Sequence, residues 1–89
     1  MLIKAVTVDN YKEFQYVIPK RLASHQSPYV KVRWHGVSVA YILLKSKEVV
    51  FYETTPNEVI TQKNVLETWI SKNLQLCKKV WNNNNEVKV

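Results

Sequence analysis

Between positions 29 and 53 the chain alternates apolar and polar side chains, as half-buried β-strands do. The pattern predicts strands over Tyr29–Trp34, Val37–Leu44 and Glu48–Glu53, with His35-Gly36 as a two-residue hairpin turn between the first two. Val37–Leu44 is apolar on both faces toward its end, which predicts a central strand covered on both sides. Three consecutive antiparallel strands therefore form the middle of the predicted fold.

The N-terminal part gives a less uniform pattern. Leu2–Val8 alternates and is rich in β-branched residues, which predicts a first strand. Asn10 and Glu13 then have the spacing of a helix capping box with apolar residues at helical intervals after it, although Glu13–Ile18 also has the pattern of a strand. We favour a short helix or turn here, followed by a loop over Ser24–Pro28.

A long helix is predicted from Pro56 to Asn82. Thr55 has the chemistry of an N-cap, Pro56 suits the first helical position, and Glu58 completes a capping box. A break near Gln62–Asn64 would leave a short first turn and a main helix from about Asn64. The apolar positions then recur at intervals of three and four: Val59, Ile60, Leu66, Trp69, Ile70, Leu74, Cys77, Val80 and Trp81.

The end of this helix is predicted from its charges and its asparagines. Lys78 and Lys79 fall in the expected last turn, where positive charge favours the helix dipole. The asparagine run that begins at Asn82 is a plausible stop, and residues 83–89 are expected to form a frayed tail, with an added edge strand over Glu86–Val89 as the alternative. Trp69 and Trp81 are expected to anchor the helix to the sheet.

Together these elements predict an α+β fold in a single domain that spans residues 1–89. A small antiparallel meander of three or four strands carries the C-terminal helix on one face. A chain of 89 residues supports one modest core, since chains of this size bury only about 60% of their unfolded surface. A large enclosed active site is therefore not expected.

The charge balance points to acidic partners. The chain has 13 Lys and Arg residues against 7 Asp and Glu, which gives a net charge of +6 and a pI near 9.6. Nucleic acid or an acidic protein surface are the partners that such a balance favours. Lysine-rich surfaces also keep small proteins soluble, so the charge by itself does not select between these explanations.

The chain has the features of a cytoplasmic protein. It contains no apolar run of the roughly 18 residues needed to cross a bilayer, and its first residues lack a secretory pattern, so we expect no membrane partner. Cys77 is the single cysteine, which excludes an intramolecular disulfide and a zinc site built from several thiolates. A reducing environment fits this cysteine usage.

A candidate binding surface follows from the strand pattern. Tyr29, Lys31, Arg33 and His35 are expected to project from one sheet face, mixing aromatic and cationic side chains as single-stranded nucleic-acid platforms do. The ordinary alternative is a solvated polar face, which any sheet with one buried face has. Further cations could extend the patch or form another one: Lys20, Arg21, Lys72, Lys78 and Lys79.

The sequence offers little for catalysis. His25 and His35 are the only histidines, and the carboxylates show no paired spacing. Cys77 lies in the apolar stripe of the helix and is expected to be an inert buried thiol. We predict no catalytic residues, no metal site and no cofactor, while a small ribonuclease using Lys31, Arg33 and a histidine stays open as an alternative.

The aromatic content suggests a further alternative. Large aromatics exceed what a small core readily encloses, and such residues are enriched in protein interfaces. A phage-type protein that docks on a host or defence protein would use them, and a homodimer formed through a strand edge or the helix face would cover them. These aromatics are Trp34, Tyr41, Phe51, Tyr52, Trp69 and Trp81.

From Pro28 to about Asn85 the chain resembles the small bacterial proteins of the domain of unknown function 4160 family. The matching pieces are Ser27-Pro28-Tyr29-Val30-Lys31-Val32, Leu66-Glu67-Thr68-Trp69 and Trp81. The resemblance implies a strand, a hairpin and a terminal helix, and a role in a toxin–antitoxin pair. The family's loop has two histidines before the strand valine, where this chain has Tyr29 and Lys31, so a role of those histidines does not carry over.

The function expected from the sequence is thus a small, basic, non-catalytic binding module for nucleic acid or another anionic partner, and the resemblance adds a role as a toxin–antitoxin component.

Overall fold

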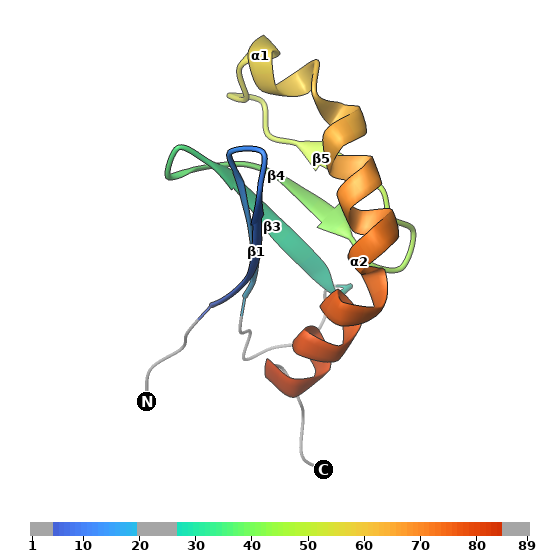
Figure 1. Cartoon of the computed structure of the whole chain (residues 1–89). Coiled ribbons are helices and arrows are strands. Elements are labelled where there is room, and N and C mark those ends of the chain that lie inside the picture. Colours follow the sequence, from blue (N-terminus) through green and yellow to red (C-terminus); the bar gives the residue numbers. More distant parts are fainter. Residues whose placement is uncertain (1–4, 20–26, 85–89) are drawn as a thin grey trace.

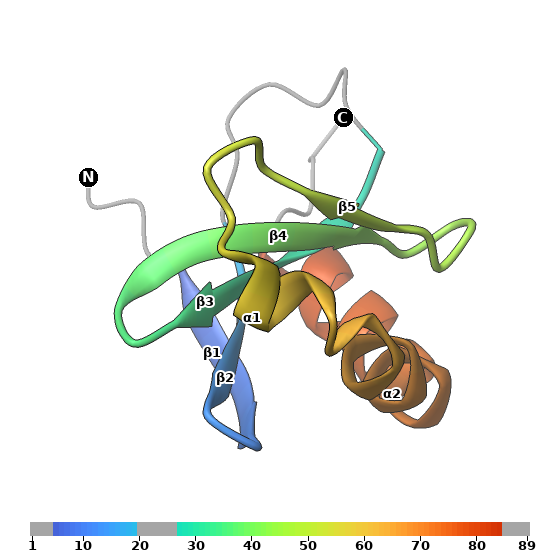
Figure 2. The same cartoon turned by 90° about the horizontal axis from the view of Figure 1, so that it is seen from above.

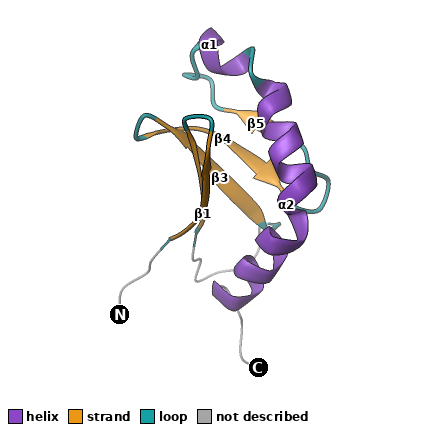
Figure 3. Ribbon diagram, viewed as in Figure 1, coloured by secondary structure: helices purple, strands orange, loops and turns teal. Residues whose placement is uncertain are grey.

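The computed structural model describes residues 5–19 and 27–84, which form one antiparallel sheet followed by two helices (Figures 1 and 3). Each strand pairs with its neighbour in the sequence, and the long second helix packs across one face of the sheet (Figure 2). This confirms the predicted α+β class, with five strands where three or four were expected. The elements are β1 (Val6–Tyr11), β2 (Phe14–Ile18), β3 (Tyr29–Trp34), β4 (Val37–Leu43), β5 (Val49–Phe51), α1 (Asn57–Ile60) and α2 (Lys63–Asn84).

The segment from Asn10 to Ile18 is a β-hairpin, so the prediction of a short helix or turn was wrong. β1 continues to Tyr11, which pairs with Phe14 across a two-residue turn. Both turn residues, Lys12 and Glu13, have positive φ, the geometry whose twist matches that of paired strands. Burial decided the outcome: Phe14, Tyr16 and Ile18 alternate along β2 and are fully enclosed beneath the helix.

The second hairpin agrees with the sequence prediction. His35 and Gly36 form the turn, both with positive φ, and join β3 to β4. Val30 and Val32 are fully buried, whereas Tyr29, Lys31 and Arg33 are half-buried on the other face. The register shifts by one residue between Val32 and Arg33, which marks a β-bulge in β4.

Among residues 5–19 and 27–84, a helix covers β4 on one face only, so the prediction of cover on both faces was wrong. Ala40, Ile42 and Leu44 are buried on the helix side. Tyr41 and Leu43 point to the other side and stay half-exposed. Apolar composition on both faces therefore does not report a second covering layer here.

Thr55 does not cap the helix, which corrects the sequence prediction. The N-cap of α1 is Pro56, and no side chain caps this end. The buried Thr55 hydroxyl instead donates to the Val39 carbonyl oxygen, which also accepts the backbone N–H of Tyr52. The Val39 carbonyl in the bulge thus accepts two hydrogen bonds. The buried Thr55 hydroxyl gains an acceptor, which matters because unpaired buried polar groups are costly.

The break in the helix lies at Thr61 and Gln62, close to its predicted place. α2 then runs through Asn84, so Lys78 and Lys79 lie before the last turn and the prediction that they complement the dipole was wrong. The helix end meets the sheet, with the Asn84 amide nitrogen 3.5 Å from the Ile18 carbonyl oxygen. Residues 85–89 of the predicted tail lie outside the described residues.

Trp69 joins the helix to the N-terminal hairpin. Its ring stacks on Tyr16 of β2 with centroids 3.7 Å apart and planes 4° apart. Its indole Nε1 donates a 2.8 Å hydrogen bond to Oδ2 of Asp9 in β1. Trp81 is likewise buried, so both tryptophans anchor α2 as predicted. The buried stripe of the helix is Leu66, Trp69, Ile70, Cys77 and Trp81.

Trp69→Ala should destabilise the fold by about 3–5 kcal/mol, because it empties the stacking site and leaves the Asp9 carboxylate without its indole donor. Urea unfolding followed by circular dichroism measures this free energy. Leu76→Ala is the matched control on the same helix, since Leu76 is 45% exposed and its truncation should cost less than about 0.5 kcal/mol. Equal losses in the two variants would contradict the anchoring role.

Candidate binding face of the sheet

The sheet face opposite α2, called the open face below, carries the residues predicted for binding. Lys31 lies opposite Val17 of β2 and Tyr41 of β4, and Arg33 lies opposite Ser38, so their side chains share one face. The strand residues on this face include no Asp or Glu. They are Thr7, Asn10, Gln15, Val17, Tyr29, Lys31, Arg33, Ser38, Tyr41, Leu43 and Val50.

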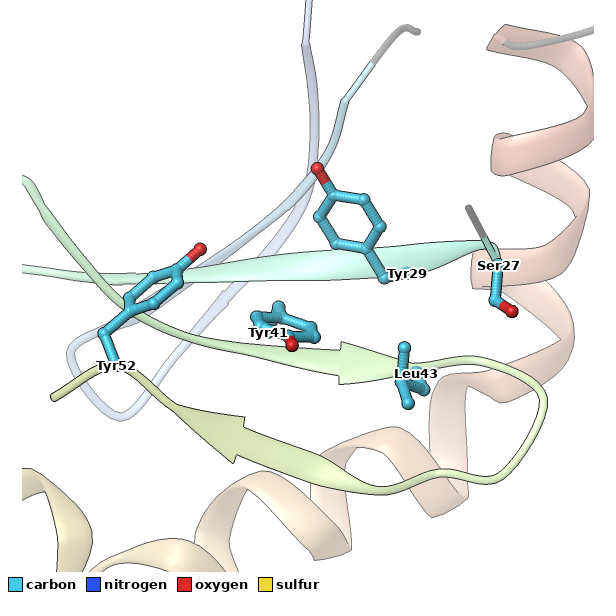
Figure 4. A pocket seen from close by; sticks show the side chains of 5 residues that line it. All are labelled: Ser27, Tyr29, Tyr41, Leu43 and Tyr52. Atoms are coloured by element: carbon cyan, nitrogen blue, oxygen red, sulfur yellow. The ribbon is translucent and has the colours of Figure 1, made fainter. Parts of the chain in front are cut away.

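A shallow cavity of about 410 Å³ opens on this face near the start of β3. Its walls are Ser27, Tyr29, Tyr41, Leu43 and Tyr52, which come from three neighbouring segments of the sheet (Figure 4). Pockets that hold small organic ligands have about 300–1,000 Å³, so this cavity is large enough for a nucleobase or a ligand of similar size.

Three tyrosines form a row across the face, called the tyrosine row below: Tyr29 on β3, Tyr41 on β4 and Tyr52 just after β5. The ring centroids of Tyr29 and Tyr41 are 5.7 Å apart at 70°, and those of Tyr41 and Tyr52 are 5.8 Å apart at 47°. These are ordinary distances for interacting aromatic pairs. Tyr52 is 36% exposed, so the row ends in a ring that a ligand can reach.

Sequence reasoning proposed Tyr29 but missed Tyr41 and Tyr52 as its neighbours. A regular hairpin around His35-Gly36 would set Lys31 opposite Ala40 and place Tyr41 on the helix side. The bulge moves the register by one residue, which brings Tyr41 opposite Lys31 on the open face.

The two cations differ in how they are held. Lys31 is half-buried between its neighbours on β2 and β4. Arg33 donates a 2.6 Å hydrogen bond from Nη2 to the Gly36 carbonyl oxygen, which fixes its guanidinium over the hairpin end. Its Nε is buried, and no group among the described residues accepts a hydrogen bond from it.

His35 does not join the tyrosine row, because it lies past the opposite end of β3 from Tyr29. Its Nε2 is 3.0 Å from Oε1 of Glu13, so this contact links the turns of the two hairpins. Its ring also meets Trp34 edge-on at 4.4 Å. Both partners of the His35–Glu13 contact are more than 60% exposed. Lys20, Arg21 and His25, which the sequence also suggested, lie outside the described residues.

Other chemistry is sparse in the described part of the chain. Over residues 5–19 and 27–84, no three His, Cys, Asp or Glu side chains cluster in a way that could hold a metal ion. Burial raises the pKa of the Cys77 thiol to about 11, which keeps it protonated at neutral pH. No helix in these ranges is long and apolar enough to span a membrane.

No protein-family model, curated protein or solved structure matches this chain. The similarity to the domain of unknown function 4160 family therefore rests on the residues quoted from the sequence.

The tyrosine row should be visible in an alkaline titration. Burial first, and then the neighbouring Tyr29 and Tyr41, raise the pKa of Tyr52 above its ordinary value of 10.0. Because the folded pKa is the higher one, unfolded chains lose this proton first, and stability should fall as the pH rises past about 10.

Tyr52→Phe should remove one tyrosinate absorbance step above pH 10 and should weaken the loss of stability with pH. Tyr16, whose pKa burial also raises, titrates in both proteins and does not affect the difference between them. A lost step centred near pH 10, as for an isolated tyrosine, would contradict the raised pKa of Tyr52.

Proposed function

We propose that this protein is a small basic module that binds single-stranded nucleic acid on the open face. The observation that carries the proposal is the tyrosine row beside Lys31 and Arg33 on a strand surface without carboxylates. Proteins that hold single strands combine a cationic track with aromatic rings on which bases stack. The net charge of +6 would attract such a ligand over a distance.

Single strands fit this surface better than duplexes do. Aromatic side chains stack on bases that are already splayed out, and in a duplex these faces are covered by neighbouring bases. Reading a duplex through its major groove needs a protruding helix or ribbon, whereas the tyrosine row lies across a sheet. The cavity beside Tyr41 adds a place for one unstacked base.

The proposal includes a role as a toxin–antitoxin component in the cytoplasm. Its support is the resemblance over Pro28 to Asn85, together with a basic surface suited to nucleic acid. Docking on a host or defence protein has weaker support, because the exposed large apolar side chains come from separate elements and do not gather on one of them. They are Val6, Val37, Tyr52, Ile60 and Leu76.

Binding should depend on salt through the cations of the open face. Each phosphate contact of a single strand contributes about 0.7 to the slope of log K against log salt, so Lys31→Ala should lower that slope by about this amount. Fluorescence anisotropy with a labelled oligonucleotide at several salt concentrations measures it. Lys72→Ala, an exposed lysine on α2, is the charge-matched control and should leave the slope unchanged.

Affinity that does not change with salt, or that falls equally in both variants, would contradict the proposed site.

The same samples also test the ribonuclease alternative, since His35 and Glu13 form an imidazole–carboxylate pair. We expect bound RNA to stay at full length. Shortening of the RNA that disappears in His35→Ala would support catalysis in place of simple binding.

Stacking should contribute independently of charge. Tyr52→Ala removes the exposed end of the tyrosine row, and loss of one base–aromatic stack costs about 1–3 kcal/mol, or roughly 5- to 150-fold in affinity. The salt slope should stay the same, because no phosphate contact is lost. Ile60→Ala is the control for an exposed apolar side chain on another element, and its affinity should match the wild type. Equal affinity of Tyr52→Ala and the wild type would remove the row from the site.

A further inference from the structure

A second cavity lies around the end of the sheet from the open face. It has about 240 Å³ and is formed where the turn after β4 faces the C-terminal half of α2. Its lining is an apolar floor with two ammonium groups beside it: Pro28, Leu44 and Trp81, with Lys45, Lys78 and Asn82. The volume is below the range of pockets that enclose whole small molecules.

The two cavities lie on either side of residues 27–29, which line them alternately. Ser27 lines the first cavity, Pro28 the second and Tyr29 the first again. The ring of Tyr29 is 5.7 Å from that of Trp81, at an angle of 51°. Tyr52, Tyr41, Tyr29 and Trp81 therefore form one continuous series of rings from the edge of the sheet to the helix, with successive centroids 5.7–5.8 Å apart.

The charges of the second cavity match those of the open face. Lys45 and Lys78 are both exposed, and neither pairs with a carboxylate among the described residues. Two ammonium groups beside an apolar floor suit a ligand that alternates negative charges with flat apolar groups. A nucleic acid has this character, because its phosphates are charged and its bases are flat and apolar. A lysine ammonium group binds such phosphates as a point charge.

We propose that a single strand bound on the open face continues past Pro28 into the second cavity, where Lys45 and Lys78 bind its phosphates. This inference rests on the proposed function and extends it, since it predicts a bent track around the end of the sheet. Residues 27–29 line both cavities, and this shared boundary favours one ligand in both over a separate acidic peptide in the second.

Two oligothymidylates of about 4 and about 12 nucleotides separate the two parts of the track, because single-strand-binding domains of the OB type cover about 4–16 nucleotides each. Lys45→Ala/Lys78→Ala is compared with the wild type and with Lys47→Ala/Lys72→Ala. The control pair removes one lysine from the same turn and one from the same helix, neither of which lines the cavity. Circular dichroism first confirms that all three proteins are folded.

The longer strand should bind the wild type more tightly than the shorter one, and the first double variant should lower its salt slope by about 1.4, the value for two lost contacts. The shorter strand should bind all three proteins alike. Equal binding of both lengths, or equal slopes in both double variants, would overturn the extended track and leave the open face in place. Absence of binding to either length would overturn the proposed function itself.

A polyglutamate peptide is the competitor that tests the other occupant. Only the longer strand is expected to reach the second cavity. If the peptide competes weakly with both strands, the second cavity prefers the nucleic acid, as we propose. Tight binding of the peptide that is lost only in Lys45→Ala/Lys78→Ala would assign this cavity to an acidic protein segment and overturn the inference.

Discussion

The stack of Trp69 on Tyr16 is the interaction on which the arrangement of the whole protein depends. It holds the single long helix against the N-terminal hairpin, and the indole hydrogen bond extends that attachment to β1, 60 residues away in the sequence. The contact is partly offset by the Tyr16 hydroxyl, which is buried and has no hydrogen-bond partner among the described residues. Stacking area and the satisfied indole therefore have to outweigh a desolvated hydroxyl.

Because α2 packs on one face, the other face carries no helix among the described residues and has room for polar and cationic side chains. The same strands supply both sides: β3 buries Val30 and Val32 under the helix and presents Lys31 and Arg33 to solvent. A small chain has too little core to enclose a large site, so a binding site is expected on its surface, and a sheet face offers a broad one. The bulge in β4 completes it by adding Tyr41 to that surface.

The parts of the fold that the sequence predicted well are those with one dominant local pattern. The hairpin around His35-Gly36 has clean alternation and a short turn, and α2 has an apolar stripe long enough to exclude a strand. Asn10–Ile18 satisfied helical and strand patterns equally, and only burial under a distant helix separated them. Thr55 had the right chemistry for a cap, but a carbonyl in the β4 bulge competed for its hydroxyl.

The part of the candidate site that lies on one strand could be predicted from the sequence, because alternate residues of a strand share a face. Tyr29, Lys31 and Arg33 share a face because side chains alternate, whatever the rest of the chain does. The residues opposite them on β4 depend on the register of the two strands. That register is set by a bulge, which no turn residue in the sequence indicates. The contact of Tyr29 with Trp81 depends further on where the helix ends.

The order of the strands has a consequence for how the molecule assembles. Every pairing in the sheet joins segments adjacent in the sequence, so β1 to β5 can form through short loops at low entropic cost. The helix is synthesised after the strands and has to return across the sheet that they form. Until it docks, the apolar side of the sheet lacks its cover, whereas the tyrosine row already has all of its strands. The open face thus belongs to the early, locally assembled part of the chain, and the closing of the core belongs to the late part.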